Sequence, residues 1–281
     1  MAIIISGLLV SGLYALIAVG FTMIYGVGRV ENLAHGAYAM VAAYVFYAVT
    51  AQLQLPIPVG FILAILTGVA LALATYKGLI GRFLGNPTAI FISTLLLAVV
   101  LEYAISVVFT PASRNLLPIV PGTSNVLGIR VSNDLILVTI VSWVCLGGLL
   151  FFVRRSHLGR AIRAISEGPR GALILGINVE RANLVVWALA GALAAIAGVF
   201  FGAYTHLVPH MWVFPLVIAF SIVIVGGIGS IEGSIIAAYV IGMAETAMMM
   251  MISTRLRGVF SMGILIVILL ARPRGFLGKE M

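Results

Sequence analysis

Long apolar runs follow one another along almost the whole chain, with short polar segments between them. A helix needs about 20 apolar residues to cross a membrane, because each residue adds about 1.5 Å and the hydrocarbon layer is about 30 Å thick. The pattern therefore predicts membrane-spanning helices. The runs lie near residues 3–27, 33–50, 57–76, 87–109, 135–153, 182–204, 213–226, 233–251 and 259–271.

Charged side chains are too few for a water-soluble fold. They make up 9% of the residues, against about 25% in soluble domains, and the mean hydropathy is +1.23. We therefore predict an all-α fold, a polytopic inner-membrane helical bundle with eight or nine transmembrane segments in one domain over residues 1–281. The run 213–226 is short and ends in Gly226-Gly227-Ile228-Gly229, which indicates a re-entrant half-helix near 213–230.

The basic residues predict an orientation, because cytoplasmic loops carry an excess of Lys and Arg. With nine alternating spans, twelve of the sixteen basic residues fall on one side, which is then cytoplasmic. The N-terminus lies outside and the C-terminus inside. The net charge of +8 is spread between apolar runs, so it does not indicate nucleic-acid binding. The remaining four basic residues, on the outer side, are Arg114, Arg130, Arg255 and Arg257.

Small residues recur every fourth position in one run, at Ala190, Ala194 and Gly198. Such stripes let helices approach one another closely in lipid. Packing within the chain is favoured here over a dimer face.

Two connections are long enough to have a function of their own, an external one at 110–134 and a cytoplasmic one at 154–181. In the second, apolar residues at 158, 161, 162 and 165 recur at helical spacing and form one face. Gly168-Pro169 interrupts the helix, and a short second helix, about 170–176, is expected to end at Gly176. An apolar face in this place fits either lipid headgroups or a partner protein, and composition leaves both open.

Several motifs resemble those of the branched-chain amino acid ABC transporter permeases, in the family's order and spacing from about residue 12 to residue 275. Two positions depart from the family pattern. Glu167-Gly168 stands where an acidic pair is common, and Ile218 stands where many members carry a charge, which bears on the solute. The matching segments are Tyr14-Ala15-Leu16, Tyr25-Gly26, Asn32-Leu33-Ala34-His35-Gly36, Gly159-Arg160-Ala161, Arg163-Ala164, Ala172-Leu173, Gly176-Ile177-Asn178, Gly226-Gly227-Ile228-Gly229-Ser230, Gly233 and Glu245.

The resemblance implies a permease subunit that moves branched-chain or other hydrophobic amino acids by alternating access. It also implies partners: a second permease subunit of different but homologous sequence, two ATPase subunits and an extracytoplasmic substrate-binding protein. The wider group includes permeases for urea, short amides and sugars, so these solutes stay as alternatives. The residues expected to couple the chain to the ATPases are Leu158, Gly159, Arg160, Ala161, Arg163, Ala164, Glu167, Leu173, Gly176 and Asn178.

ATP and Mg are expected on the partner subunits, with no cofactor on this chain. A phosphate-binding loop needs Gly-x-x-x-x-Gly-Lys-Ser/Thr, and neither lysine of the chain, Lys77 or Lys279, lies in such a motif. The chain by itself is therefore not expected to be an enzyme.

A zwitterionic solute needs polar groups along its path, because bare hydrocarbon excludes it. Glu102 and Ser106 are four residues apart and share a helix face. For Glu102, a place in the pathway and a structural hydrogen bond between helices are equally supported. The pathway candidates are Asn32, His35, Ser93, Thr94, Glu102, Ser106 and Ser221.

For Asn32 and His35, a hydrogen bond that stabilises a turn is slightly favoured over a solute contact, because the neighbouring Arg29 and Glu31 indicate a position near the surface. Glu245 lies well inside an apolar run and is interpreted as an acceptor for a neighbouring helix.

On the outer side, Arg114 and Arg130 are candidates for docking the binding protein, with plain solvated loop charges as the alternative. His206 and His210 are four residues apart, but no third ligand is evident, so an interfacial belt is favoured over a metal site.

Two other functional classes lack their signatures in the sequence. A stand-alone secondary transporter or channel typically has paired carboxylates near the midplane, whereas the apolar runs here hold two distant glutamates, Glu102 and Glu245. An intramembrane enzyme needs a clustered base, nucleophile or metal set, and no such motif is present in the sequence.

Overall fold

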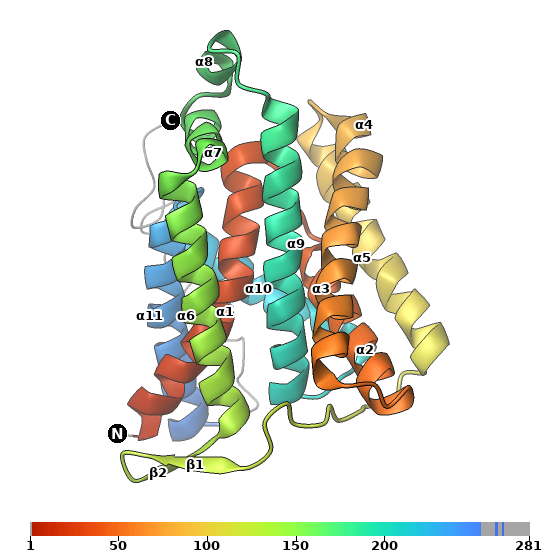
Figure 1. Cartoon of the computed structure of the whole chain (residues 1–281), viewed down its shortest axis with the longest axis vertical. Coiled ribbons are helices and arrows are strands. Elements are labelled where there is room, and N and C mark those ends of the chain that lie inside the picture. The colour runs from red at the N-terminus through yellow and green to blue at the C-terminus, as the bar shows by residue number, and fades with distance from the viewer. Residues whose placement is uncertain (1, 254–261, 264–265, 267–281) are drawn as a thin grey trace.

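The computed structural model describes residues 2–253, 262–263 and 266 as a bundle of long helices with one small hairpin (Figure 1). The long apolar runs form these helices because a helix satisfies every backbone N–H and C=O within itself. In chain order the elements are α1 (Ala2–Gly28), α2 (His35–Tyr47), α3 (Ile57–Thr75), α4 (Gly81–Phe83), α5 (Pro87–Phe109), β1 (Thr123–Val126), β2 (Ile129–Ser132), α6 (Asn133–Arg155), α7 (His157–Glu167), α8 (Pro169–Ile174), α9 (Val179–Tyr204), α10 (Val213–Gly226) and α11 (Ile231–Met251).

Three short turns supplement these elements. A π-helical turn, Ala48–Gln52, extends α2, and a second one, Tyr76–Ile80, joins α3 to α4. A 3₁₀ turn, Pro209–Trp212, leads into α10.

Seven helices in the described part are long and apolar enough to cross a membrane. Of the nine predicted spans, 259–271 lies outside the described residues apart from isolated positions. The span predicted at 33–50 is a continuous helix made of α2, His35–Tyr47, and the π-helical turn Ala48–Gln52, and it is not one of the seven. The spans are Ala2–Gly28, Ile57–Phe83, Pro87–Phe109, Asn133–Arg155, Val179–Tyr204, Pro209–Gly226 and Ile231–Met251.

The two ends of the bundle differ in charge. We call the end that carries α7 and α8 the α7 end, and the end that carries β1 and β2 the hairpin end (Figure 1). The α7 end holds basic residues from the ends of α3, α6 and α9 and from α4, α7 and α8, whereas the connection at the hairpin end contributes Arg114 and Arg130. Those at the α7 end are Arg29, directly after α1, and Lys77, Arg82, Arg154, Arg155, Arg160, Arg163, Arg170 and Arg181.

α1 and α9 form the centre of the bundle. α1 packs against α6, α9, α10 and α11, and α9 also contacts α2 and α3. The small residues of α9 face inward, since Ala190 and Ala194 are fully buried. At Gly198 a Cβ would lie 2.0 Å from the carbonyl oxygen of Ala39 in α2. The stripe therefore packs within the chain, as predicted.

α2 begins deep inside the bundle. After α1 ends at Gly28, the chain turns back, and the side chain of His35 reaches the carbonyl oxygen of Ile17. Ile17 lies about 16 Å from the end of α1, at about 1.5 Å per residue. The non-helical segment 29–34 thus enters the bundle, where protein covers it, as irregular backbone at membrane depth requires.

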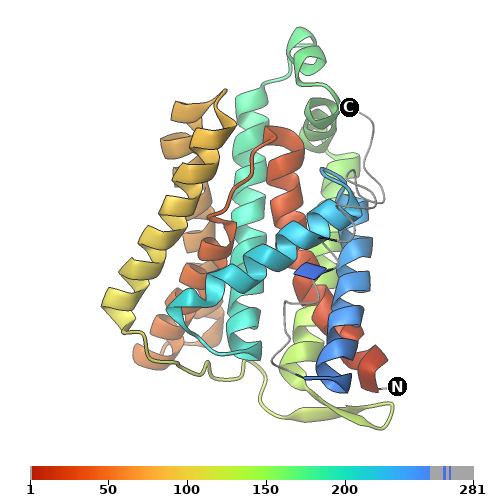
Figure 2. The ribbon, with the colours of Figure 1, turned by 180° about the vertical axis from the view of Figure 1, so that it is seen from behind.

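The prediction of a re-entrant half-helix near 213–230 is wrong. Figure 2 shows α10 running obliquely across the bundle between α5 and α11. α10 starts after α9 has reached the hairpin end, and it leads into α11. The first turn of α11 lies at the end of α6, because Glu232 forms an ion pair with Arg154. α10 therefore passes toward the α7 end and does not return to its starting side.

A two-stranded antiparallel hairpin in the external connection is an exception to the all-α prediction. Its turn residues Leu127 and Gly128 both have positive φ, 51° and 86°. Two such residues form the tight turn that matches the twist of a hairpin. The rest of this connection contains Pro111, Pro118 and Pro121.

Candidate functional site

α7 and α8 form a helix–break–helix module that lies across the end of the bundle. Ser156 caps α7, because its Oγ accepts a hydrogen bond from the backbone N–H of Gly159 at 2.8 Å. Gly168-Pro169 breaks the two helices as predicted. Gly176, with φ +74°, ends the short α8 in the left-handed conformation that glycine favours.

The apolar face of α7 is covered by the chain itself. Ile162 and Ile165 are buried, and α7 contacts α1, α6 and α9. Gly159 makes this seat possible, since a Cβ there would lie 2.4 Å from the carbonyl oxygen of Phe152. The expectation that lipid headgroups or a partner must cover this face is therefore wrong for its central residues.

The surface of the module that remains open is of two kinds. The polar side of α7 exposes Arg160, Arg163 and Glu167. The tip after α8 exposes three apolar side chains, with 61% of Leu173, 87% of Ile174 and 78% of Leu175 accessible. Ile174 and Leu175 were not among the predicted coupling residues, although the run Leu173-Ile174-Leu175 before a terminating glycine was visible in the sequence. Leu158, Ala161 and Ala164 are half-buried.

Asn178 acts as a helix cap in this structure. Its Oδ1 accepts a hydrogen bond from the backbone N–H of Arg181 at 2.8 Å, at the start of α9. The side chain thereby fixes the angle at which the chain leaves the module and enters the bundle.

The glycine-rich turn between α10 and α11 is tied to the end of α6, immediately before the module. A Cβ at Gly233 would lie 2.0 Å from the carbonyl oxygen of Gly226, so the two helices meet with their backbones in contact. Ser230 caps α11 by accepting from the N–H of Gly233 at 3.0 Å. Glu232, in the first turn, pairs with Arg154 at the end of α6, immediately before α7.

Asn32 and His35 lie at the centre of the bundle, not near its surface. Both are fully buried. Asn32 donates to the hydroxyl of Tyr38 at 3.1 Å and accepts from the N–H of Ala34 at 3.1 Å. His35 places Nε2 3.1 Å from the carbonyl oxygen of Ile17 and therefore donates there. The charged neighbours misled the prediction because the chain turns inward directly after them.

Two more pathway candidates are occupied by internal hydrogen bonds. Thr94 is fully buried and accepts from the backbone N–H of Leu33 at 3.2 Å, which ties α5 to the start of α2. Ser221 is fully buried and donates to the carbonyl oxygen of Val217 at 2.8 Å. In this conformation neither side chain reaches open space. Ser93 and Ser106 are half-buried on α5.

Glu102 is held by two side chains that precede α10. Its Oε2 accepts from the indole N–H of Trp212 at 2.6 Å, and its Oε1 lies 3.0 Å from Nδ1 of His210. Trp212 is buried, whereas the side chain of Glu102 is 23% exposed. A carboxylate near the hairpin end thus joins α5 to the start of α10. No sequence pattern indicates this contact, because the partners lie more than a hundred residues apart.

Arg114 is engaged within the chain. Its guanidinium donates to the carbonyl oxygen of Phe109 at 2.7 Å and to the hydroxyl of Tyr47 at 2.9 Å, and it lies over the Tyr47 ring. Its backbone also pairs with Leu207. Arg114 therefore clamps three elements together and leaves few donors for a partner, whereas Arg130 is exposed on the hairpin.

His206 and His210 have separate partners. His206 lies 2.8 Å from the side-chain oxygen of Asn115, while His210 faces Glu102. Within the described ranges, no group of three or more His, Cys, Asp or Glu residues could hold a metal ion. Glu245 is fully buried in α11.

Sequence comparison places these features in a known family. A family model described as "Branched-chain amino acid transport system / permease component" matches residues 3–269. The high-affinity branched-chain amino acid transport system permease protein LivH of Escherichia coli (strain K12) is 32% identical over 291 residues, which cover 98% of this chain and 94% of LivH. The corresponding protein BraD of Pseudomonas aeruginosa is 31% identical over 294 residues, 98% of this chain and 95% of BraD.

Two further similarities are more distant. The xylose transport system permease protein XylH of Escherichia coli (strain K12) is 32% identical over 121 residues, 41% of this chain and 30% of XylH. The structure of PsaBC from Streptococcus pneumoniae in complex with Fab matches with a TM-score of 0.56 at 13% identity, covering 99% of this chain and 93% of that one, which shows a shared fold. With the family model matching nearly the whole chain, this multi-pass membrane protein belongs to the branched-chain amino acid transport permease family.

Proposed function

We propose that this chain is one of two permease subunits of an ATP-binding-cassette importer, and that it carries branched-chain or other hydrophobic amino acids inward across the inner membrane. The α7–α8 module is the observation on which this rests. It is a rigidly seated projection with a polar side and an apolar tip, at the basic end of a bundle that otherwise consists of membrane helices.

Transport energy comes from two ATPase subunits that bind ATP and Mg. One of the two ATPases would bind the exposed side of α7, at Arg160, Arg163 and Glu167, and the apolar tip at Leu173, and the other would bind the second permease subunit. Because α7 is seated on α1, α6 and α9, a displacement of the module moves the centre of the bundle with it. ATP drives the cycle only if it binds one conformation more tightly than the other.

The α7 end is then cytoplasmic, and the hairpin end faces outward, with the N-terminus outside and the C-terminus inside. The clustering of basic residues at the α7 end supports this orientation. The second permease subunit is a different, homologous chain. An extracytoplasmic binding protein delivers the solute to the hairpin end, where Arg130 is exposed on β2.

Glu102 is the pathway residue that the geometry supports best. It is partly exposed near the outer end, and its carboxylate is oriented by Trp212 and His210. A carboxylate in this position can meet the ammonium group of an incoming amino acid. Ser106, one turn further along α5, lies on the same side. Asn32, His35, Thr94 and Ser221 would take part only if the bundle opens between α1, α2, α5 and α10.

The coupling role is tested by replacing Arg160 and Ala161 with Glu in the assembled transporter. We expect ATPase subunits to dissociate and uptake to be lost, while the unfolding temperature of the permease stays unchanged, because Arg160 is exposed and Ala161 only half-buried. Arg155→Glu is the matched control, since it reverses a charge at the same end but outside α7. Full ATPase association with full uptake in the double variant would refute the assignment.

The solute is tested by competition in proteoliposomes that contain the complete transporter. We expect leucine uptake to be inhibited by isoleucine and valine, and not by urea, acetamide or xylose. The alternative is a small polar solute of the wider group. It is motivated by Ile218, which is fully buried on α10 and stands where many members of the family carry a charge. Inhibition by urea or acetamide at equal concentration would favour that alternative.

A further inference from the structure

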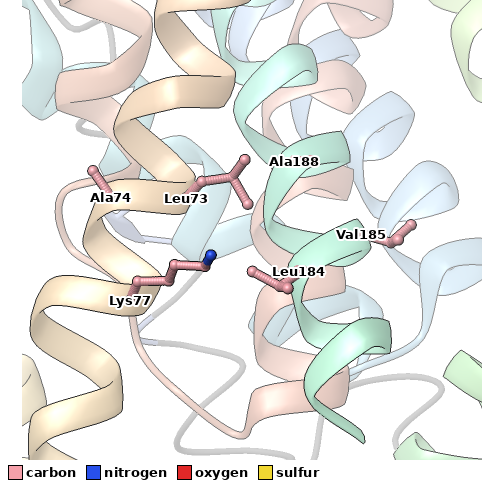
Figure 3. A pocket seen from close by; sticks show the side chains of 6 residues that line it. All are labelled: Leu73, Ala74, Lys77, Leu184, Val185 and Ala188. Carbon is pink, nitrogen blue, oxygen red and sulfur yellow. The ribbon is translucent and has the colours of Figure 1, made fainter. Parts of the chain in front are cut away.

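A groove opens between α3 and α9 near the α7 end, away from the residues discussed above (Figure 3). Its volume is about 380 Å³, and it is a shallow hollow that is largely open to its surroundings. Five of its lining side chains are apolar and one is a lysine: Leu73, Ala74, Lys77, Leu184, Val185 and Ala188.

The shape of the groove follows from how α3 and α9 meet. Their backbones are in close contact where a Cβ at Gly68 would lie 2.5 Å from the carbonyl oxygen of Gly191. Toward the α7 end the rings of Tyr76 and Trp187, with centroids 5.6 Å apart, fill the inner part of the same interface. The groove is the outer flank of this interface.

The π-helical turn Tyr76–Ile80 begins at this level. Such turns insert an extra residue into a helix and are frequent at functional sites. Here the turn carries Lys77, whose side chain extends from α3 toward Leu184 of α9 (Figure 3).

Lys77 has no described partner of opposite charge. No hydrogen bond or ion pair joins it to any residue in the described part of the chain. It lies within the candidate span Ile57–Phe83, about 9 Å from its end at about 1.5 Å per residue. A lysine at this depth can bring its amine to the level of the lipid headgroups by bending toward the end of the span, whereas in this structure the side chain lies across the groove toward Leu184 (Figure 3). Arg82 and Arg181 add positive charge at the same end, and Glu180, one turn before Leu184 on α9, adds one negative charge.

We infer that this groove is a binding site for one anionic phospholipid of the leaflet at the α7 end. The headgroup phosphate pairs with the Lys77 ammonium, and an acyl chain lies along Leu73 and Ala188. Basic pockets between membrane helices are suited to anionic headgroups. A neutral helix of a partner subunit in the groove would instead leave the Lys77 charge buried and unpaired, which is unfavourable.

The test is native mass spectrometry of the delipidated full-length protein, titrated with phosphatidylglycerol and with phosphatidylcholine. We expect one phosphatidylglycerol to bind in preference to phosphatidylcholine. Lys77→Ala should weaken that binding about fivefold, as the loss of one lysine near a charged headgroup implies. Ala188→Phe keeps the charge and fills the groove, and it should also weaken binding. Arg155→Ala removes a cation from the same end of the bundle, away from the groove, and should bind as the wild type does.

Four results would overturn the inference. The first is equal affinity for the two lipids. The second is unchanged phosphatidylglycerol binding in both groove variants when both unfold at the wild-type temperature. The third is competition by glycerol phosphate, which carries the headgroup chemistry without acyl chains. The fourth, measured on the assembled transporter, is loss of the second permease subunit in Ala188→Phe with phosphatidylglycerol binding intact, which would assign the groove to a protein partner.

Discussion

Replacing Gly159 with Ala should displace α7 from its contact with α6 and weaken ATPase binding, while the thermal stability of the helix bundle changes little. The added Cβ would lie 2.4 Å from the carbonyl oxygen of Phe152 and 2.5 Å from Cα of Val153. Both are backbone atoms, so no flexible side chain can move aside. Ordinary contact begins at 3.4 Å, so α7 must shift by about 1 Å, the difference between 2.4 and 3.4 Å.

Two opposing terms set the magnitude. Alanine favours a helix over glycine by about 1 kcal/mol, whereas overpacking costs about 1–3 kcal/mol. The difference between these two free energies, about 0–2 kcal/mol, destabilises the conformation in which α7 packs on α6. If this difference is about 2 kcal/mol, the affinity of the ATPase for the packed module falls by roughly 30-fold, because 1.4 kcal/mol corresponds to a tenfold change in affinity.

The assay compares ATPase association, leucine uptake and thermal unfolding in reconstituted transporter. We expect Gly159→Ala to weaken association and reduce uptake at limiting ATPase, while the unfolding temperature changes little because α7 lies at the end of the bundle. Gly148→Ala in α6 is the matched control, since no heavy atom lies within 4 Å of its added Cβ. Wild-type association and uptake in Gly159→Ala would show that α7 tolerates the shift and would refute the reasoning.

Three further predictions concern the bundle and its outer end. Gly198→Ala, whose Cβ would lie 2.0 Å from the Ala39 carbonyl oxygen, should lower the free energy of unfolding by about 1–3 kcal/mol, whereas Gly147→Ala should not; equal unfolding temperatures in detergent would contradict this. Arg114→Ala should lower stability by about 1.5–3 kcal/mol per charged hydrogen bond lost and speed proteolysis of 110–134; an unchanged cleavage rate would count against the clamp. Glu102→Gln should raise the half-saturating leucine concentration about 10- to 100-fold; retained uptake with unchanged preference would remove Glu102 from the pathway.

Local sequence features predicted much of the fold because membrane helices satisfy their own backbone. The run ending at Gly28, the break at Gly168-Pro169 and the glycine-rich turn at Gly226 all lie where the pattern indicated. Each depends on residues close in sequence. The first depends on the length of an apolar run, the second on the missing backbone N–H of proline, and the third on a backbone conformation that only glycine readily adopts.

Long-range contacts account for what the sequence did not predict. The Arg114 clamp depends on Tyr47, and the orientation of Glu102 depends on His210 and Trp212. No periodicity relates such positions. His35 was misplaced for a related reason, since its depth depends on the chain turning inward after α1, which neither hydropathy nor charge records.

The early turn inward has a consequence for how the chain enters a bilayer. The α-helical part of α2 has 13 residues and reaches only about 20 Å, and even with the π-helical turn Ala48–Gln52 the segment stays below the hydrocarbon thickness of about 30 Å. The amides of Leu33 and Ala34, just before it, find their acceptors on Thr94 and Asn32, and Gly198 covers its flank. Since α5 and α9 are synthesised later, α2 can settle only after they emerge, and a nascent chain cut short before Val179 should leave it accessible to water-soluble labels.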